Sequence, residues 1–161
     1  MNHRINKLLN HPKYVEYLNK ISNHEAGRLF CTHDLTHFLD TARIAYILNL
    51  ENNLNIPKDL IYGAALLHDI GKWQQYENGI SHEVASGTLC VELLCDAGYK
   101  SKEVDLIKSA ILSHRNPSVE GTKDLLGIIY VADKLSRKCY NCKMTNQCDW
   151  SDEKKNFNIS Y

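Results

Sequence analysis

The sequence has few residues that interrupt helices, with only three prolines among 161 residues. Its apolar residues recur at spacings of three and four rather than two, which is the period of a helix and not of a strand. We therefore predict an all-α protein, a single-domain bundle of about six helices. A chain of this length buries enough surface to fold without cross-links.

A net charge is also missing, because 19 lysine and arginine residues balance 19 aspartate and glutamate residues. No overall field draws such a protein to a nucleic acid polymer or to anionic lipid, so we expect neither as a partner. No apolar run approaches the ~18 to 20 residues that span a membrane. The sequence leaves the oligomeric state open, a homodimer included.

A secretory signal is absent from the first residues, MNHRINKLLNH, which lack an apolar stretch and a cleavage site of small residues. We therefore expect a cytoplasmic protein. In that reducing compartment the six cysteines should be buried, reactive or metal-bound instead of paired in disulfides.

Capping and turn signals divide the chain into helices and loops. We expect residues 1–138 to form the helical domain, and residues 139–161 to form an irregular, cysteine-containing tail packed on it. Residues 72–80 are predicted to form a loop that could cover a neighbouring site, with Trp73 and Tyr76 either stacking on a base or anchoring the loop. The expected helices cover about residues 4–24 with a break at His11-Pro12, 34–50 capped by Asp34, Pro57 to Gly71, 82–97 capped by Ser81, 102–114 capped by Ser101, and Thr122 to Arg137.

A histidine and an aspartate, His68 and Asp69, end the apolar run in AALLHDIGKW. Left unpaired in a buried helix, both groups would cost several kcal/mol. Further imidazoles and carboxylates share a helix face with apolar residues or begin a helix, and these are His37, His82, His114 and Asp133.

Each of these residues alone is explained as a core residue with satisfied hydrogen bonds. Together they place four histidines and two aspartates on five expected helices, mostly facing the core. A divalent metal is the group that holds such a cluster together at low cost.

The order of these residues resembles the H…HD…D signature of the HD-domain metal-dependent phosphohydrolases, an all-helical superfamily. The segments THFLDTARIA, LLHDIGK and YVADKLSR carry the resemblance, which covers about residues 28–138. His82 and His114 extend it toward the two-metal branch, H…HD…H…H…D, which includes bacterial diadenosine tetraphosphate hydrolases. The Gly-Tyr-Pro motif of the cyclic-dinucleotide branch is absent, since Arg115-Asn116-Pro117 follows His114.

The resemblance implies a site for one or two divalent ions. Asp69 would bridge them, with His37, His68 and Asp133 on the first ion and His82 and His114 on the second. Imidazole and carboxylate ligands suit iron, manganese, zinc, cobalt or nickel rather than calcium.

Such a site predicts a phosphohydrolase that cleaves a nucleotide or small phosphate ester by attack of a metal-activated water, with Asp69 and Lys72 as catalytic residues. Lys72, Arg115 and Arg137 are the candidate substrate-binding cations, because each lies close to an expected ligand; the alternative is that they are solvated surface charges. Arg137 follows Asp133 by four residues, which would place both on one helix face. A non-catalytic metal or nucleotide sensor built on the same cage is the alternative function.

Three cysteines of the tail, Cys139, Cys142 and Cys148, form a C-x2-C-x5-C pattern in CYNCKMTNQC. Three thiolates are one short of a closed tetrahedral site. Cys31 is the expected fourth ligand, with His33 in reserve. The sequence leaves three alternatives for these cysteines: a structural zinc, an iron–sulfur cluster or free thiols. An interaction protein organised around the cysteine site is a further alternative function.

Overall fold

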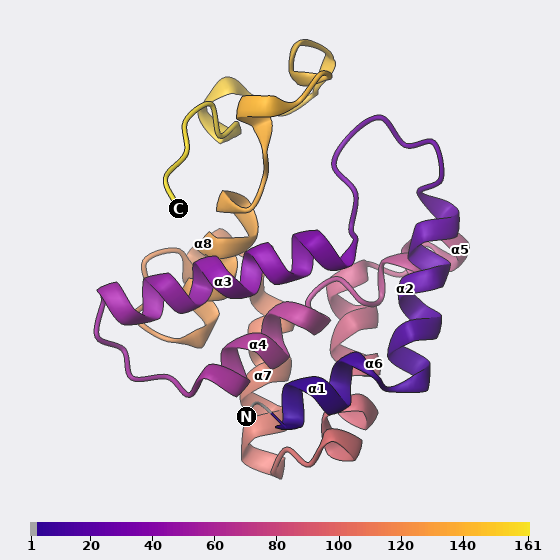
Figure 1. Cartoon of the computed structure of the whole chain (residues 1–161), viewed down its shortest axis with the longest axis vertical. Coiled ribbons are helices and arrows are strands. Elements are labelled where there is room, and N and C mark those ends of the chain that lie inside the picture. The colour runs from indigo at the N-terminus through magenta and orange to yellow at the C-terminus, as the bar shows by residue number, and fades with distance from the viewer. Residues whose placement is uncertain (1–2) are drawn as a thin grey trace.

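The computed structural model describes residues 3–161. Within that range the chain contains eight α-helices, four short 3-10 helices and no strand, which confirms the predicted all-α class (Figure 1). The α-helices are α1 (His3–Leu9), α2 (Pro12–His24), α3 (Leu35–Glu51), α4 (Lys58–Leu67), α5 (Lys72–Asn78), α6 (His82–Ala97), α7 (Ser101–Ser113) and α8 (Leu125–Leu135). The 3-10 helices are η1 (Pro117–Val119), η2 (Cys139–Asn141), η3 (Thr145–Gln147) and η4 (Asp152–Lys154).

The helices pack around one apolar core. Helix α3 packs against α4 and α8, while α7 packs against α4, α6 and α8. Helix α4 is the most enclosed element, because seven of its ten residues are buried. No helix in residues 3–161 has the length and apolar character needed to cross a membrane.

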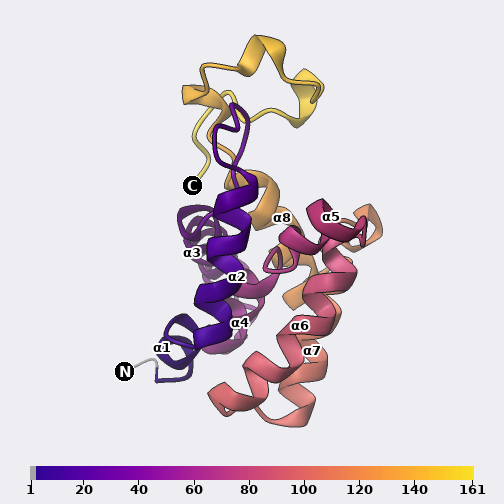
Figure 2. The same ribbon diagram turned by 90° about the vertical axis from the view of Figure 1, so that its right-hand side faces the viewer.

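Two segments extend from one end of this bundle. In both views the connection between α2 and α3 and the segment that follows α8 lie at the same end of the molecule (Figures 1 and 2). The C-terminal segment returns to the bundle through Asn156, whose side-chain amide donates hydrogen bonds to the carbonyl oxygens of Lys134 at 2.8 Å and Arg137 at 3.0 Å.

Local signals placed several helix ends correctly. Asp34 caps α3, since its carboxylate accepts a hydrogen bond from the His37 amide at 2.9 Å. Gly98 closes α6 in the left-handed conformation, with φ of +90°. Ser81 occupies the N-cap position of α6 as predicted, although its side chain makes no capping bond. The predicted cap of α7 was wrong, because Ser101 lies inside the helix and Lys100 occupies the capping position.

The structure has more helices than the expected six for two reasons. The first helical region is divided in two at the predicted break, where Pro12 begins α2. Residues 72–78, expected as a loop, form α5, since no proline or glycine interrupts them between Gly71 and Gly79. Trp73 anchors this helix by stacking on Tyr17 with ring centroids 5.6 Å apart.

Two helices are shorter than predicted. Helix α4 ends at Leu67, and the chain turns before Gly71 instead of continuing as helix. Helix α8 begins at Leu125 because the Asp124 carboxylate accepts from the Gly127 amide at 3.0 Å, and it ends at Leu135. His68 and Asp69 therefore follow the end of α4, and Asp133 lies in the last turn of α8.

Candidate metal centre

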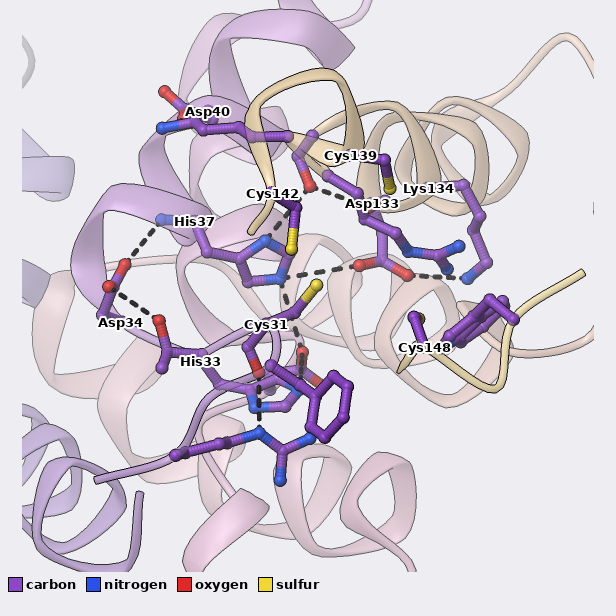
Figure 3. Close-up of a pocket in the computed structure, with 18 of the residues that line it drawn as sticks. Cys31, His33, Asp34, His37, Asp40, Asp133, Lys134, Cys139, Cys142 and Cys148 are labelled. Carbon is purple, nitrogen blue, oxygen red and sulfur yellow. Dashed lines mark hydrogen bonds and ion pairs between the residues drawn. The ribbon is translucent and has the colours of Figure 1, made fainter. Parts of the chain in front are cut away.

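Six histidine and aspartate side chains from five helical regions converge at one place (Figure 3 shows His37 and Asp133 among them). His37 lies in the first turn of α3, and Asp133 in the last turn of α8. His68 and Asp69 follow α4 directly, where the helix ends inside the core. His82 begins α6, and His114 is the residue that ends α7.

One group of potential ligand atoms belongs to His37, His68, Asp69 and Asp133, which lie within 4.8 Å of one another. Asp69 Oδ2 lies 3.1 Å from His68 Nε2 and 3.6 Å from His37 Nε2. Asp133 Oδ1 lies 3.5 Å from His37 Nε2 and 3.6 Å from His68 Nε2. Two imidazole nitrogens and two carboxylate oxygens therefore surround one small volume.

A second group consists of Asp69, His82 and His114, again within 4.8 Å. Here the other carboxylate oxygen, Asp69 Oδ1, lies 3.1 Å from His82 Nε2 and 3.4 Å from His114 Nε2. This oxygen is buried and has no hydrogen-bond donor. The two oxygens of one carboxylate thus face two different histidine pairs.

All four histidines of these groups present the same ring nitrogen to Asp69. Their opposite nitrogens, Nδ1, contact oxygens. Three of these oxygens are carbonyl or amide oxygens, which only accept, and the fourth, the Ser136 hydroxyl, already donates to the Asp133 carbonyl at 2.7 Å, so each Nδ1 carries the proton in a neutral ring. Each Nε2 atom then carries an unprotonated lone pair. Even so, the Nε2 atoms of His37 and His68 lie 3.2 Å apart, and those of His82 and His114 also lie 3.2 Å apart. The Nδ1 partners are Ser136 Oγ for His37 at 3.1 Å, the Ala65 carbonyl for His68 at 2.7 Å, Gln75 Oε1 for His82 at 2.6 Å and the Ile111 carbonyl for His114 at 2.6 Å.

The donor set therefore fits divalent metal ions. Facing lone pairs repel one another, and an undonated carboxylate oxygen is costly in the core, whereas a cation between them satisfies both. The carbonyl, amide and hydroxyl oxygens behind the rings fix the orientation that exposes Nε2, as the hydrogen-bond acceptors behind metal-bound histidines do.

Without a metal, protons must supply part of this positive charge. Burial opposes the charged form of His68, but Asp69 and Asp133 raise its pKa to about 10. Burial likewise opposes ionisation of Asp69, but the positive charge of His68 and the proximity of His114 and His37 hold its pKa well below the usual value. His82 differs, because burial lowers its pKa to about 4.

The centre opens into a pocket of about 630 Å³. Lys72 lies at its edge, with Nζ 3.4 Å from Gln75 Oε1 and 3.5 Å from His82 Nδ1, and burial lowers its pKa. Arg115 is more exposed and pairs with Glu83 at 3.4 Å. The basic residues that line the pocket are Arg28, Lys72, Arg115, Lys134, Arg137, Lys138 and Lys155.

Arg137 does line the pocket, but not where the helical spacing placed it. It was expected above Asp133 on one helix face, and α8 ends before it, at Leu135. Its guanidinium instead lies 3.9 Å from the centre of the Trp150 ring. Lys134 takes the place beside Asp133, with Nζ 2.6 Å from Oδ2, and also donates to the His114 carbonyl at 2.6 Å.

Sequence reasoning missed the residues that support His33. This histidine was considered for the cysteine site, but its ring hydrogen-bonds to Glu25, and its Nε2 lies 3.8 Å from Asp69 Oδ2. The Tyr76 hydroxyl donates to the same glutamate at 2.7 Å. No sequence spacing connects Glu25 to the HD residues, because α2 and α5 meet only in the folded chain.

The four cysteines of the predicted thiolate site all line the same pocket. Burial raises the pKa of the Cys31 thiol, and the neighbouring thiols of Cys139, Cys142 and Cys148 raise it further. However, the clusters of ligand atoms within 4.8 Å found in residues 3–161 contain no cysteine. No three of the four sulfur atoms in the described chain therefore lie within that distance of one another.

A family model described as HD domain matches residues 34–138. An uncharacterized protein of Clostridium beijerinckii (strain ATCC 51743 / NCIMB 8052) is 48% identical over 158 residues, which cover 98% of this chain and 99% of that protein. Ribonuclease Y of Acetivibrio thermocellus is 30% identical over 126 residues, which cover 78% of this chain but 21% of that protein.

Among solved structures, a predicted HD superfamily hydrolase from an uncultured Thermotogales bacterium superposes with a TM-score of 0.65. The match covers 89% of this chain and 79% of the other, at 20% sequence identity. At that identity the likeness establishes the fold.

Proposed function

Because this chain belongs to the HD domain family, we propose that it is a metal-dependent phosphohydrolase that cleaves a nucleotide or a small phosphate ester with water. The observation that supports this proposal is the position of Asp69, whose two oxygens each face a pair of histidine Nε2 atoms. Divalent ions held in such a site supply a Lewis acid and lower the pKa of bound water.

The ligand assignment follows from the two groups around Asp69. We assign His37, His68 and Asp133 to one ion and His82 and His114 to the other, with Asp69 shared between them. Neutral imidazoles and carboxylates favour iron, manganese, zinc, cobalt or nickel. A structure with both groups preformed supports the two-metal form of the family over a single ion.

The pocket supports a phosphate-bearing small molecule as the substrate. Its volume lies in the range of small-molecule sites, and its rim carries cations that can neutralise phosphate oxygens. Lys72 is the closest of the predicted cations to the centre, and its partial burial strengthens its field at the substrate. Arg115 and Arg137 contact surface partners and are better placed to bind the more distant part of a nucleotide.

Hydrolysis of an aryl phosphate and of a nucleotide panel that includes diadenosine tetraphosphate tests the proposal. With manganese or ferrous iron added, we expect turnover in the wild type and a loss of at least about 100-fold in Asp69→Asn. Asp105→Asn is the matched control, because Asp105 is exposed on α7 and lies outside the pocket. Lys72→Ala should raise KM by about 10- to 100-fold, the value of a charge-assisted hydrogen bond.

Two outcomes would replace this function with another. Metal bound without turnover on any of these compounds would overturn the hydrolase proposal and favour a metal or nucleotide sensor. Preferential cleavage of a short RNA would instead favour RNA as the substrate, as the name of the relative ribonuclease Y indicates for that protein.

A further inference from the structure

Four cysteines from two distant parts of the chain line the pocket together (Figure 3). Cys31 lies in the connection between α2 and α3, and Cys139, Cys142 and Cys148 lie in the segment that follows α8. None of them forms a disulfide. Cys90 and Cys95 lie on α6 and do not line the pocket, so the gathering involves only these four thiols.

The backbone at these cysteines is held by groups other than the thiols. The Thr145 hydroxyl lies 2.7 Å from the Cys142 carbonyl and 3.1 Å from the Cys139 carbonyl, which closes the loop that carries both residues. On the other side of the pocket, Arg28 Nε donates to the Cys31 carbonyl at 2.8 Å. These four cysteines line the pocket, and within residues 3–161 their sulfur atoms form no disulfide.

The separation of the sulfurs discriminates between two kinds of metal site. A tetrahedral zinc with Zn–S bonds of about 2.3 Å holds its thiolates about 3.8 Å apart. In the described chain no three of these cysteines meet even the 4.8 Å limit. A [4Fe–4S] cluster binds each thiolate to a different iron at the corners of a cube, which keeps the sulfurs further apart.

We propose that Cys31, Cys139, Cys142 and Cys148 bind a [4Fe–4S] cluster. The four thiols release four protons as they bind, and the resulting anionic centre is balanced by basic pocket residues, among them Arg28, Arg137 and Lys138. Phe30 and Trp150 also line this pocket, so aromatic side chains are present beside the four cysteines.

The cluster would join the C-terminal segment to the α2–α3 connection over the metal centre. Few apolar side chains of that segment are buried, so its own packing contributes little to holding it there. A four-thiolate cluster fixes the segment and shapes the mouth through which substrate enters. This inference is independent of the hydrolase proposal, because it concerns other residues and a different ligand.

Anaerobic purification followed by iron, acid-labile sulfide and visible absorption measurements tests the proposal. We expect ~4 sulfide ions per chain and the broad absorption of a cluster. Sulfide is the decisive quantity, since iron bound by histidine and aspartate brings none. Cys142→Ser and Cys31→Ser should each lose the sulfide and the absorption, whereas Cys95→Ser, which removes an exposed thiol outside the pocket, should retain both.

The Cys31 variant carries the most information, because only a site that spans both segments depends on it. Zinc in a 1:1 ratio, without sulfide and lost in Cys142→Ser, would overturn the cluster in favour of a single ion. Absence of any cysteine-dependent metal, after anaerobic reconstitution with ferrous iron and sulfide, would overturn the site itself.

A second measurement needs no variant and so avoids any folding defect. Oxidative removal of the cluster from the wild type should expose the C-terminal segment to trypsin, with faster cleavage at Lys143. An unchanged digestion pattern would show that the cluster does not hold this segment.

Discussion

The Nε2 atoms of His37 and His68 lie 3.2 Å apart, although 31 positions separate these residues in the chain. Each ring is oriented by an oxygen at its Nδ1 atom, so in the neutral state neither Nε2 has a proton to donate to the other. The same arrangement recurs between His82 and His114. A protein core tolerates such pairs when a cation lies between them, and the first predictions follow from this requirement.

Metal removal should lower the stability of the fold. A metal present at 100 times its Kd adds about 2.7 kcal/mol to the free energy of unfolding, which for a chain of this size raises Tm by about 5 to 10 °C. Thermal denaturation with a chelator, and then with added manganese, measures the difference. The control variant Asp105→Asn should show the same metal-dependent increase in Tm. If added metal does not raise the Tm of the wild type, metal binding at the centre is contradicted.

Two ions should be separable by mutation. His114→Ala removes a ligand of one group only, so we expect the metal content per chain to fall by about half. Asp69→Ala removes the shared carboxylate and should abolish most binding at both positions. Metal analysis of the purified variants decides this, and a wild-type content of one ion per chain would refute the shared-carboxylate arrangement.

Gly71→Ala should destabilise the protein for steric reasons alone. The φ of Gly71 is −87°, which any residue adopts, but an added Cβ would lie 2.7 Å from the Ala85 carbonyl carbon on α6 and closer still to the Ser86 nitrogen. We expect a cost of about 1 to 3 kcal/mol together with lower metal affinity, because His82 is carried by α6. Chemical denaturation and metal titration measure the two effects.

Gly79→Ala provides the comparison for that variant. Its φ of +71° strains an alanine, but nothing lies within 4 Å of the added Cβ. It should lose stability while keeping metal affinity. Equal loss of metal affinity in both variants would disprove the steric argument at Gly71.

Glu25 should make stability depend on acid pH. Burial opposes its ionisation, but hydrogen bonds and charge from His33 lower its pKa from 4.5 to about 2. A lowered carboxyl pKa stabilises the folded state fully above pH 4.5, by an upper value of about 3 kcal/mol, and this contribution disappears as the pH falls toward 2.

Measuring the free energy of unfolding of Glu25→Gln and of the wild type from pH 2 to pH 6 tests the direction of this pH dependence. The variant should be less stable than the wild type at pH 6, and the difference should shrink as the pH falls. Glu92→Gln is the control, because this glutamate is exposed and pairs with Lys13 at the surface. A difference between Glu25→Gln and the wild type that does not change with pH would rule out the ionised pair.

The sequence predicted the fold class and the helices that carry the HD residues because these features are local. Apolar spacing identifies a helix, while Asp34 marks the start of α3 and Gly98 the end of α6. The doublet His68-Asp69 ends an apolar run, where burial of unpaired polar groups costs free energy and therefore indicates a binding partner. Residue type and order were therefore enough to predict a common site. The predictions of a loop at residues 72–80 and of Arg137 on the helix face of Asp133 were wrong. Trp73 packs on Tyr17 and so stabilises α5, and α8 ends before it reaches Arg137.

Only the tertiary structure determined which atoms meet. The division of one carboxylate between two histidine pairs, the support of His33 by Glu25 and the gathering of four cysteines at one pocket depend on tertiary packing. They follow from how the helices and the C-terminal segment approach one another. Sequence by itself determined that histidine, aspartate and cysteine are present in ligand-like patterns. Their distances, which distinguish one kind of metal centre from another, come from long-range packing that no local signal encodes.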